Sequence, residues 1–112
     1  GIRDRSVSLG SEMCIRDRSK GAINMLTKQI ACEVAADHIT VNALAPTFIE
    51  TAINRHQLQD PVFKNALEDR IPVGRIGQFS DLMGLLLLLV SDASQFLTGQ
   101  IYLIDGGISA RQ

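Results

Sequence analysis

The alternation of apolar and polar residues predicts a buried strand over residues 39–45, I-T-V-N-A-L-A. β-Branched residues open this stretch, and small or apolar residues on both faces suit a parallel strand that is covered on both sides. Pro46 ends the strand, because proline has no N–H for the ladder and a fixed φ. Residues 47–51 then leave the carboxyl end of the strand, where ligands bind in open α/β sheets.

A helical period precedes this strand, from Ser19 to about Ala36. Its apolar positions fall three and four residues apart and form one face, which predicts packing against a sheet. The residues of that face are Ile23, Leu26, Ile30 and Val34. The short connection into the strand is typical of α/β units.

A long polar connection follows the strand, over residues 51–72. It predicts short helices near residues 52–58 and 61–70, the second with Pro61 in its first turn. Such a connection at the carboxyl end of a strand is often a lid. Residues 71–77, I-P-V-G-R-I-G, then form a loop.

A second helix and a second strand complete the pattern. The helix is expected from Asp81 to Asp92, capped by Ser80, and its continuous apolar run over residues 85–90 predicts deep packing. The strand is expected over residues 101–104, I-Y-L-I. Strand, crossover helix and strand form a βαβ unit with parallel strands. The fold class is therefore α/β, in the order helix, strand, lid, helix, strand.

Composition limits the function classes. The 112 residues allow one domain, and 11 basic against 12 acidic residues give a net charge of −1. This balance provides no electrostatic attraction to nucleic acid or to an anionic membrane. The longest apolar run, residues 82–90, is too short to span a bilayer. The two cysteines and two histidines lack metal-ligand spacing, so we expect no metal and a reduced, cytoplasmic protein.

Residues 1–18 differ in character from the rest. I-R-D-R-S occurs at residues 2–6 and again at 15–19, and no helical or strand period persists. We expect this segment to be disordered or artefactual, and the chain to be a fragment because it does not begin with Met. Residues 7–18 resemble translated sequencing-adapter sequence. Recovery of the same segment from clean genomic DNA would refute that hypothesis.

Several short motifs occur in one order and together resemble the carboxyl-terminal part of a short-chain dehydrogenase/reductase, over residues 19 to about 110. They are S-K-G-A at 19–22, V-N-A-L-A-P at 41–46, F-I-E-T at 48–51, G-R-I-G at 74–77, S-D-A-S at 91–94, T-G-Q at 98–100 and D-G-G at 105–107. The resemblance implies the carboxyl-terminal portion of a Rossmann-like, doubly wound parallel sheet that binds NAD or NADP.

The resemblance also implies roles for four residues. Lys20 matches the family lysine that holds the nicotinamide ribose and favours a neighbouring tyrosinate by its charge. Pro46, Ile49 and Thr51 belong to the loop at the nicotinamide end, where Ile49 would offer its backbone and Thr51 its hydroxyl. An exposed lysine at a helix start and a threonine that caps a short helix are the structural alternatives. Thr47 stands where the family usually has glycine.

One departure bears on activity. The family tyrosine should stand four residues before Lys20, and Arg16 occupies that position. A guanidinium does not exchange a proton near neutral pH, so it cannot replace a tyrosine as general acid and base. Tyr102, in the last strand, is no substitute, and no glycine-rich phosphate-binding turn is present in the sequence. His56 could face a substrate from the lid, although a solvated loop histidine is the more common role.

The resemblance implies hydride transfer between nicotinamide and a secondary alcohol or ketone, with a polyol, sugar or sugar acid as a substrate by analogy. It also implies a homo-oligomer, dimer or tetramer. Arg16 leads us to expect that this chain is inactive. The alternatives are a non-catalytic oligomerisation or interaction fragment and, less favoured, a small domain unrelated to the family. An unpaired edge of the strand at Ile39 would be an aggregation risk.

Overall fold

The computed structural model describes residues 5–111, and the side chains of residues 18–111. The chain forms two compact units. The first comprises the described residues up to Ala43 together with Thr98–Gln100, and the second comprises Leu44–Leu97 and the described residues from Ile101 onward. Five regular elements have predicted counterparts. They are three helices, α1 (Arg5–Val34), α2 (Pro61–Arg70) and α3 (Ser80–Leu89), and two strands, β1 (Ala43–Pro46) and β2 (Ile101–Ile104).

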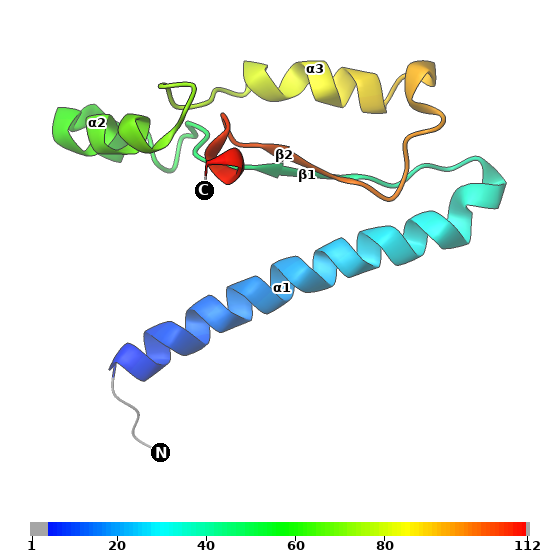
Figure 1. Ribbon diagram of the computed structural model, residues 1–112, viewed down its shortest axis with the longest axis horizontal. Coiled ribbons are helices and arrows are strands. Elements are labelled where there is room, and N and C mark those ends of the chain that lie inside the picture. Colours follow the sequence, from blue (N-terminus) through cyan, green and yellow to red (C-terminus); the bar gives the residue numbers. More distant parts are fainter. Residues whose placement is uncertain (1–4, 112) are drawn as a thin grey trace. The chain divides into compact units, whose positions relative to one another are not determined.

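The two strands pair in parallel, as predicted. The Ala43 amide donates to the Gln100 carbonyl at 2.9 Å, and the Thr47 amide donates to the Ile104 carbonyl at 3.0 Å. From the first of these bonds to the second, the donor and the acceptor residue both advance by four positions, which defines a parallel register. Figure 1 shows the strands side by side, and the chain leaving β1 toward α2. The predicted α/β class and the parallel βαβ connection are therefore confirmed.

The first unit contains α1, which is longer than the predicted helix. It begins at Arg5 instead of Ser19, and no proline interrupts residues 5–34. Whether residues 1–18 are foreign to the protein stays a prediction, and residues 1–4 lie outside the described part.

The packed stripe of α1 also differs from the predicted face. Ile23 and Leu26 are each 57% exposed, whereas Thr27 and Ala31 are buried. A Cβ added to Gly99 would lie 3.5 Å from Cβ of Ala31, so the helix approaches the strand-side backbone through a small residue. The prediction that the larger aliphatic residues pack is wrong for Ile23 and Leu26, because small residues allow this close approach.

The second unit has a small apolar core formed by Leu58, Ile71 and Ile76. Phe48, Leu67 and Ile108 pack against these three residues. The core therefore joins the loop after β1, the lid, the loop before α3 and the carboxyl-terminal segment. α2 begins with Pro61 in its first turn, as predicted, and the Asp60 carboxylate accepts a hydrogen bond from the Val62 amide at 3.0 Å.

Three element predictions need correction. β1 begins at Ala43, not Ile39, although the Val41 amide still donates to Thr98 Oγ1 at 3.0 Å. The helix predicted over residues 52–58 is a turn followed by a 3₁₀ helix, Gln57–Gln59. α3 begins at Ser80 itself, so Ser80 is not its cap, and it ends at Leu89.

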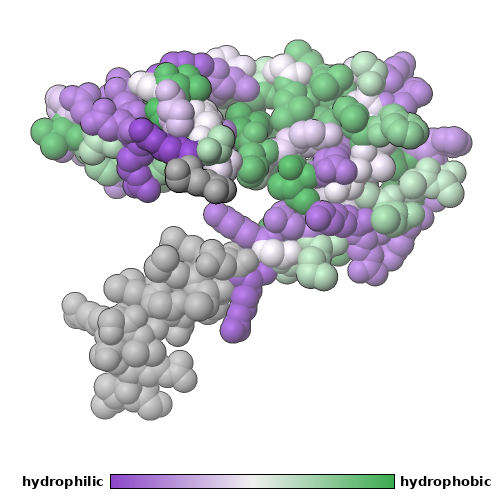
Figure 2. Space-filling model, viewed as in Figure 1, coloured by the Kyte–Doolittle hydropathy of each residue, from purple (hydrophilic) through white to green (hydrophobic). Residues whose placement is uncertain are grey.

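The predicted deep packing of α3 is wrong. No residue of α3 is buried, and Leu87 is 60% exposed. Figure 2 shows apolar residues gathered on the surface over this helix. Its apolar residues are uncovered because no described element packs over this face.

Candidate functional site

The loop after β1 is held against its neighbours by backbone hydrogen bonds. The bond from Thr47 to Ile104 carries the parallel ladder one residue beyond Pro46. Gly77 then pairs with Ile49 in an isolated parallel bridge: the Gly77 amide donates to the Phe48 carbonyl at 2.9 Å, and the Glu50 amide donates to the Gly77 carbonyl at 2.8 Å. Residues 47–50 are therefore fixed by β2 and by the loop before α3.

Phe48 has a positive φ of 55°, which is unusual for a bulky residue. Its side chain packs against the core of the second unit, and the Arg70 guanidinium lies 5.6 Å from the centroid of its ring. Packing on one side and the Gly77 bridge on the other hold this backbone conformation. Strained residues that the surrounding structure stabilises in this way are common at ligand sites.

The side chain of Asn54 holds the rest of the loop. Its Nδ2 donates to the Ile49 carbonyl at 2.9 Å, and its Oδ1 accepts from the Thr51 amide at 2.7 Å. The sequence analysis missed Asn54. Asparagine often bonds to nearby backbone in turns, so its position three residues after Thr51 was a usable signal.

The backbone of Ile49 has one unused donor. In a parallel bridge the flanking residues make the bonds, so the N–H and C=O of Ile49 point away from Gly77. The carbonyl bonds to Asn54, and the N–H has no acceptor among the described residues. The Thr51 hydroxyl likewise has no partner within the described part. Two donors therefore remain available on the loop at the carboxyl end of β1.

A cavity of about 200 Å³ lies at the carboxyl ends of the two strands. Its apolar wall comes from Ile49, Ile71, Val73 and Ile104, and Thr47, Asp105 and Gly106 line it at the strand ends. Ligand pockets are more often 300–1,000 Å³, so this cavity would hold only a small part of a ligand.

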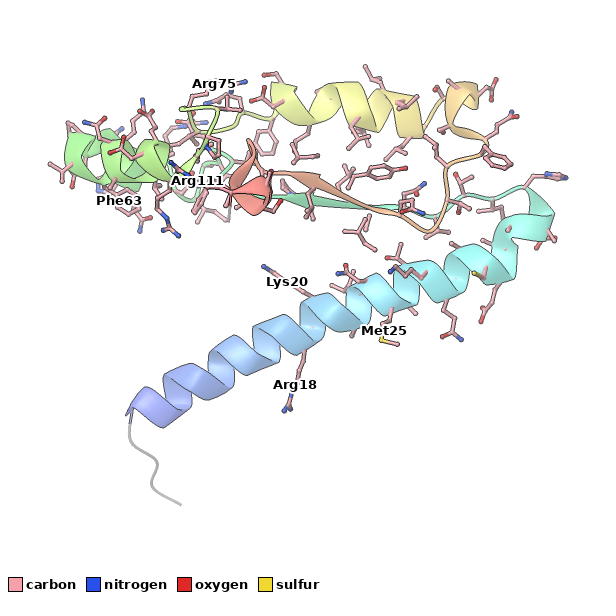
Figure 3. All side chains as sticks on the ribbon, in the orientation of Figure 1. Arg18, Lys20, Met25, Phe63, Arg75 and Arg111 are labelled. Carbon is pink, nitrogen blue, oxygen red and sulfur yellow. The ribbon has the colours of Figure 1, made fainter. Side chains whose placement is uncertain are left out.

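An ion pair borders this cavity. Arg75, on the loop between α2 and α3 (Figure 3), donates through Nη1 and Nη2 to the two carboxylate oxygens of Asp81 at 2.7 and 2.8 Å. Together with a hydrogen bond from the Gln78 amide, this contact holds the pKa of the Asp81 carboxyl far below its ordinary value, and the Arg75 pKa is raised. The pair fixes the start of α3 relative to the Gly77 bridge.

Asp105 caps the turn that follows β2. Its carboxylate accepts hydrogen bonds from the Gly107 amide and from the amide and hydroxyl of Ser109, and these bonds lower its pKa, that of Ser109 Oγ most. Both carboxylates that line the cavity are thus fully engaged within the chain.

The four predicted site residues divide between the two units. Lys20 is exposed on α1 (Figure 3) and belongs to the first unit. The other three belong to the second unit: Pro46 is the last residue of β1, and Ile49 and Thr51 lie on the loop after it. The backbone of Arg16 lies in α1, but its side chain is outside the described residues.

The remaining candidate residues have ordinary surroundings. His56 is exposed in the lid, and Tyr102 is half-buried in β2. Among the side chains that the structure describes, no group of His, Cys, Asp and Glu could hold a metal ion. None of the helices in the described range combines the length and hydropathy of a membrane span.

Comparison with known proteins extends these observations. A family model described as enoyl-(acyl carrier protein) reductase matches residues 7–109. A tropinone reductase homologue of Arabidopsis thaliana is 41% identical over 104 residues, which are 93% of this chain and 38% of the relative. The chain therefore spans less than half the length of its curated relatives.

Solved structures show the same relationship. A gluconate 5-dehydrogenase of Burkholderia cenocepacia, in complex with NADP and tartrate, is 40% identical with a TM-score of 0.76, over 85% of this chain and 37% of that one. A 4-hydroxyisoleucine dehydrogenase complexed with NADH is 29% identical with a TM-score of 0.79, over 85% and 39%. The order of motifs, the parallel strands and the family match agree: the chain belongs to the short-chain dehydrogenase/reductase family and covers part of its Rossmann-like fold.

Proposed function

We propose that this chain is the carboxyl-terminal part of an NAD- or NADP-dependent oxidoreductase that interconverts a secondary alcohol and a ketone. Family membership supports the reaction class. The observation that carries the site is the loop at the carboxyl end of β1, where the Ile49 N–H and the Thr51 hydroxyl remain available as donors. These groups suit the carboxamide of a nicotinamide.

In the proposed reaction, hydride leaves the carbinol carbon for the nicotinamide ring, and the hydroxyl proton goes to a base on the protein. Lys20 would hold the ribose hydroxyls and stabilise a neighbouring anion by its positive charge. Pro46, Ile49 and Thr51 would set the orientation of the carboxamide. Arg16 cannot accept the proton, so the chain as given lacks the proton-transfer step.

A chimaera tests this proposal directly. Residues 16–112 are joined to the amino-terminal part of the Burkholderia cenocepacia dehydrogenase, with Arg16 or with Arg16→Tyr. We expect NADP reduction with gluconate by the Arg16→Tyr chimaera. With Arg16 the turnover should be lower by a factor of about 100 or more, because general acid–base catalysis contributes that much. The 112-residue chain alone should show no turnover.

Two outcomes would contradict the proposal. Equal turnover of the two chimaeras would remove the role of position 16. A folded Arg16→Tyr chimaera that binds NADP without oxidising gluconate or a polyol would refute the function assigned to the carboxyl-terminal part.

The substrate class is proposed by analogy with relatives that act on sugar acids, and includes polyols and sugars. The choice between NAD and NADP stays open in the proposal, since similar proteins bind either. We further propose a cytoplasmic homo-oligomer. Gel filtration and cell fractionation of the intact reading frame would check both points.

One observation favours a second function, that of a non-catalytic interaction fragment. Large apolar side chains are exposed on α3 and on α1. These include Met25 on α1, 74% exposed, and Leu87 on α3, 60% exposed. A defined oligomer of folded chain in sedimentation would support this function, whereas ill-defined aggregates would support an incomplete enzyme.

A further inference from the structure

Asn54 connects two backbone groups that flank Glu50. Its amide is used at both ends, as donor to the Ile49 carbonyl and as acceptor from the Thr51 amide, and both bonds are partly shielded from solvent. An asparagine is required for this pair of contacts, because aspartate lacks the donor and serine is shorter.

These two bonds fix consecutive peptide groups. The Ile49 carbonyl belongs to the peptide plane before Glu50, and the Thr51 amide belongs to the plane after it. The Gly77 bridge already fixes the preceding plane, through the Phe48 carbonyl, and also the Glu50 amide. Gly77 and Asn54 together therefore define the backbone from Phe48 to Thr51.

We propose that Asn54 is a positioning residue for the nicotinamide end of the cofactor. The inference rests on the proposed function. Asn54 itself makes no bond to the cofactor. It fixes the Ile49 carbonyl and the Thr51 amide, and with them the backbone that carries the Thr51 hydroxyl, next to the peptide plane of the Ile49 N–H that the Gly77 bridge fixes. The loop is then already ordered when the carboxamide binds. Groups whose orientation is fixed in advance bind more tightly because less conformational entropy is lost.

The test uses the full 112-residue chain and nicotinamide mononucleotide as probe, followed by ¹⁵N–¹H spectra. Three variants are compared. Asn54→Ala removes both bonds, and Asn54→Asp keeps the acceptor for Thr51 but removes the donor to Ile49. Asn65→Asp introduces the same charge on the exposed surface of α2, where Asn65 has no side-chain bond within the described part.

We expect the probe to shift the Ile49 amide resonance in the unsubstituted chain and in Asn65→Asp. Its dissociation constant should rise about tenfold in Asn54→Ala, the usual effect of losing such hydrogen bonds. Amide exchange at Thr51 should be faster in Asn54→Ala but remain slow in Asn54→Asp, which distinguishes the two bonds. Unchanged resonances of Leu58 and Ile76 would show that the core stays folded.

Equal affinity of Asn54→Ala and the unsubstituted chain would overturn the positioning role. Unchanged exchange at Thr51 in Asn54→Ala would overturn the proposed fixing of the loop. If the unsubstituted chain gives no saturable shift at Ile49, the nicotinamide site proposed for this loop fails, and the exchange data still decide separately whether Asn54 fixes the loop.

Discussion

Gly106 and Gly84 differ in what an added side chain would meet. Gly106 has a φ of 62°, and its Cβ would lie 2.6 Å from Cγ2 of the buried Ile71. Gly84 lies within α3, where a Cβ would meet no described atom within 4 Å. We expect Gly106→Ala to lower the free energy of unfolding by about 1–3 kcal/mol, and Gly84→Ala to raise it by about 0.5–1 kcal/mol. Urea unfolding measures both, and similar values for the two variants would contradict the structure.

Asp81 makes the stability of the second unit depend on pH. Hydrogen bonds from Arg75 and from the Gln78 amide lower the pKa of its carboxyl from the ordinary 3.8. A lowered pKa in the folded state means that the stabilisation is fully present above the unfolded pKa. It is lost as the pH falls below about 3.8 toward the folded pKa. We therefore expect the urea midpoint to fall between pH 5 and pH 2.

The control variant is Asp81→Asn, which cannot ionise. Asp105 also has a lowered pKa, so part of the acid sensitivity should persist in Asp81→Asn. A double variant that also carries Asp105→Asn should be less sensitive to acid than Asp81→Asn alone. Added salt should weaken the contribution, because the Arg75–Asp81 pair is exposed to solvent. An identical pH profile for Asp81→Asn and the unsubstituted chain would show that the ion pair does not form in solution.

The beginning of α2 depends on Asp60. Its carboxylate accepts the Val62 amide at 3.0 Å, which satisfies one of the free donors of the first turn. We expect Asp60→Ala to destabilise the chain by about 1 kcal/mol and to lower the helical ¹³Cα shifts at the start of α2. Asp69→Ala, at the opposite end of the same helix, is the control, because removing a negative charge there should be neutral or favourable. Greater loss of helix in Asp69→Ala than in Asp60→Ala would contradict this account.

The local signals in the sequence predicted α2 and β2 with the correct bounds. Pro61 marks the start of α2, and the I-Y-L-I run coincides with Ile101–Ile104. Pro46 was expected to stop the strand but is its last residue, and the Thr47 amide still bonds to the Ile104 carbonyl. The strand starts late because the Val41 amide bonds to the Thr98 hydroxyl instead of to a ladder carbonyl. The packing of α1 and α3 could not be predicted in this way, because the period of apolar residues does not show which neighbours cover them.

The candidate site rests on family motifs, which indicated the loop with Pro46, Ile49 and Thr51. The cofactor-binding role of these three residues stays a prediction. The Gly77 bridge depends on tertiary pairing with Ile49, which the sequence does not show, whereas the bonds of Asn54 are local and had a usable signal in the sequence. The close approach of the two segments shows why residue 77 is glycine: a Cβ there would lie 2.5 Å from Cδ1 of Ile49.

The chain as a whole exposes more apolar surface than a self-contained α/β domain should. Parallel sheets normally have both faces covered. The described residues form a sheet of only two strands and a small buried core of Leu58, Ile71 and Ile76. The chain spans 38% of the length of a curated relative, in which further sequence is available to cover such surfaces. Contiguous exposed apolar surface of this kind favours association.

The apolar face of α3 gives the last prediction. Leu86, Leu87 and Leu88 are 39%, 60% and 39% exposed, and Leu87 is the most accessible of the three. We expect sedimentation velocity to show concentration-dependent association of the chain, and Leu87→Glu to weaken it, because a charge at an associated apolar surface must lose its hydration. Since Leu87 is exposed, the substitution should leave the core folded. Asn65→Glu adds the same charge on α2 and should leave association unchanged. A monomer at all concentrations, or equal effects of the two substitutions, would show that α3 does not mediate association and would remove the support for an interaction fragment.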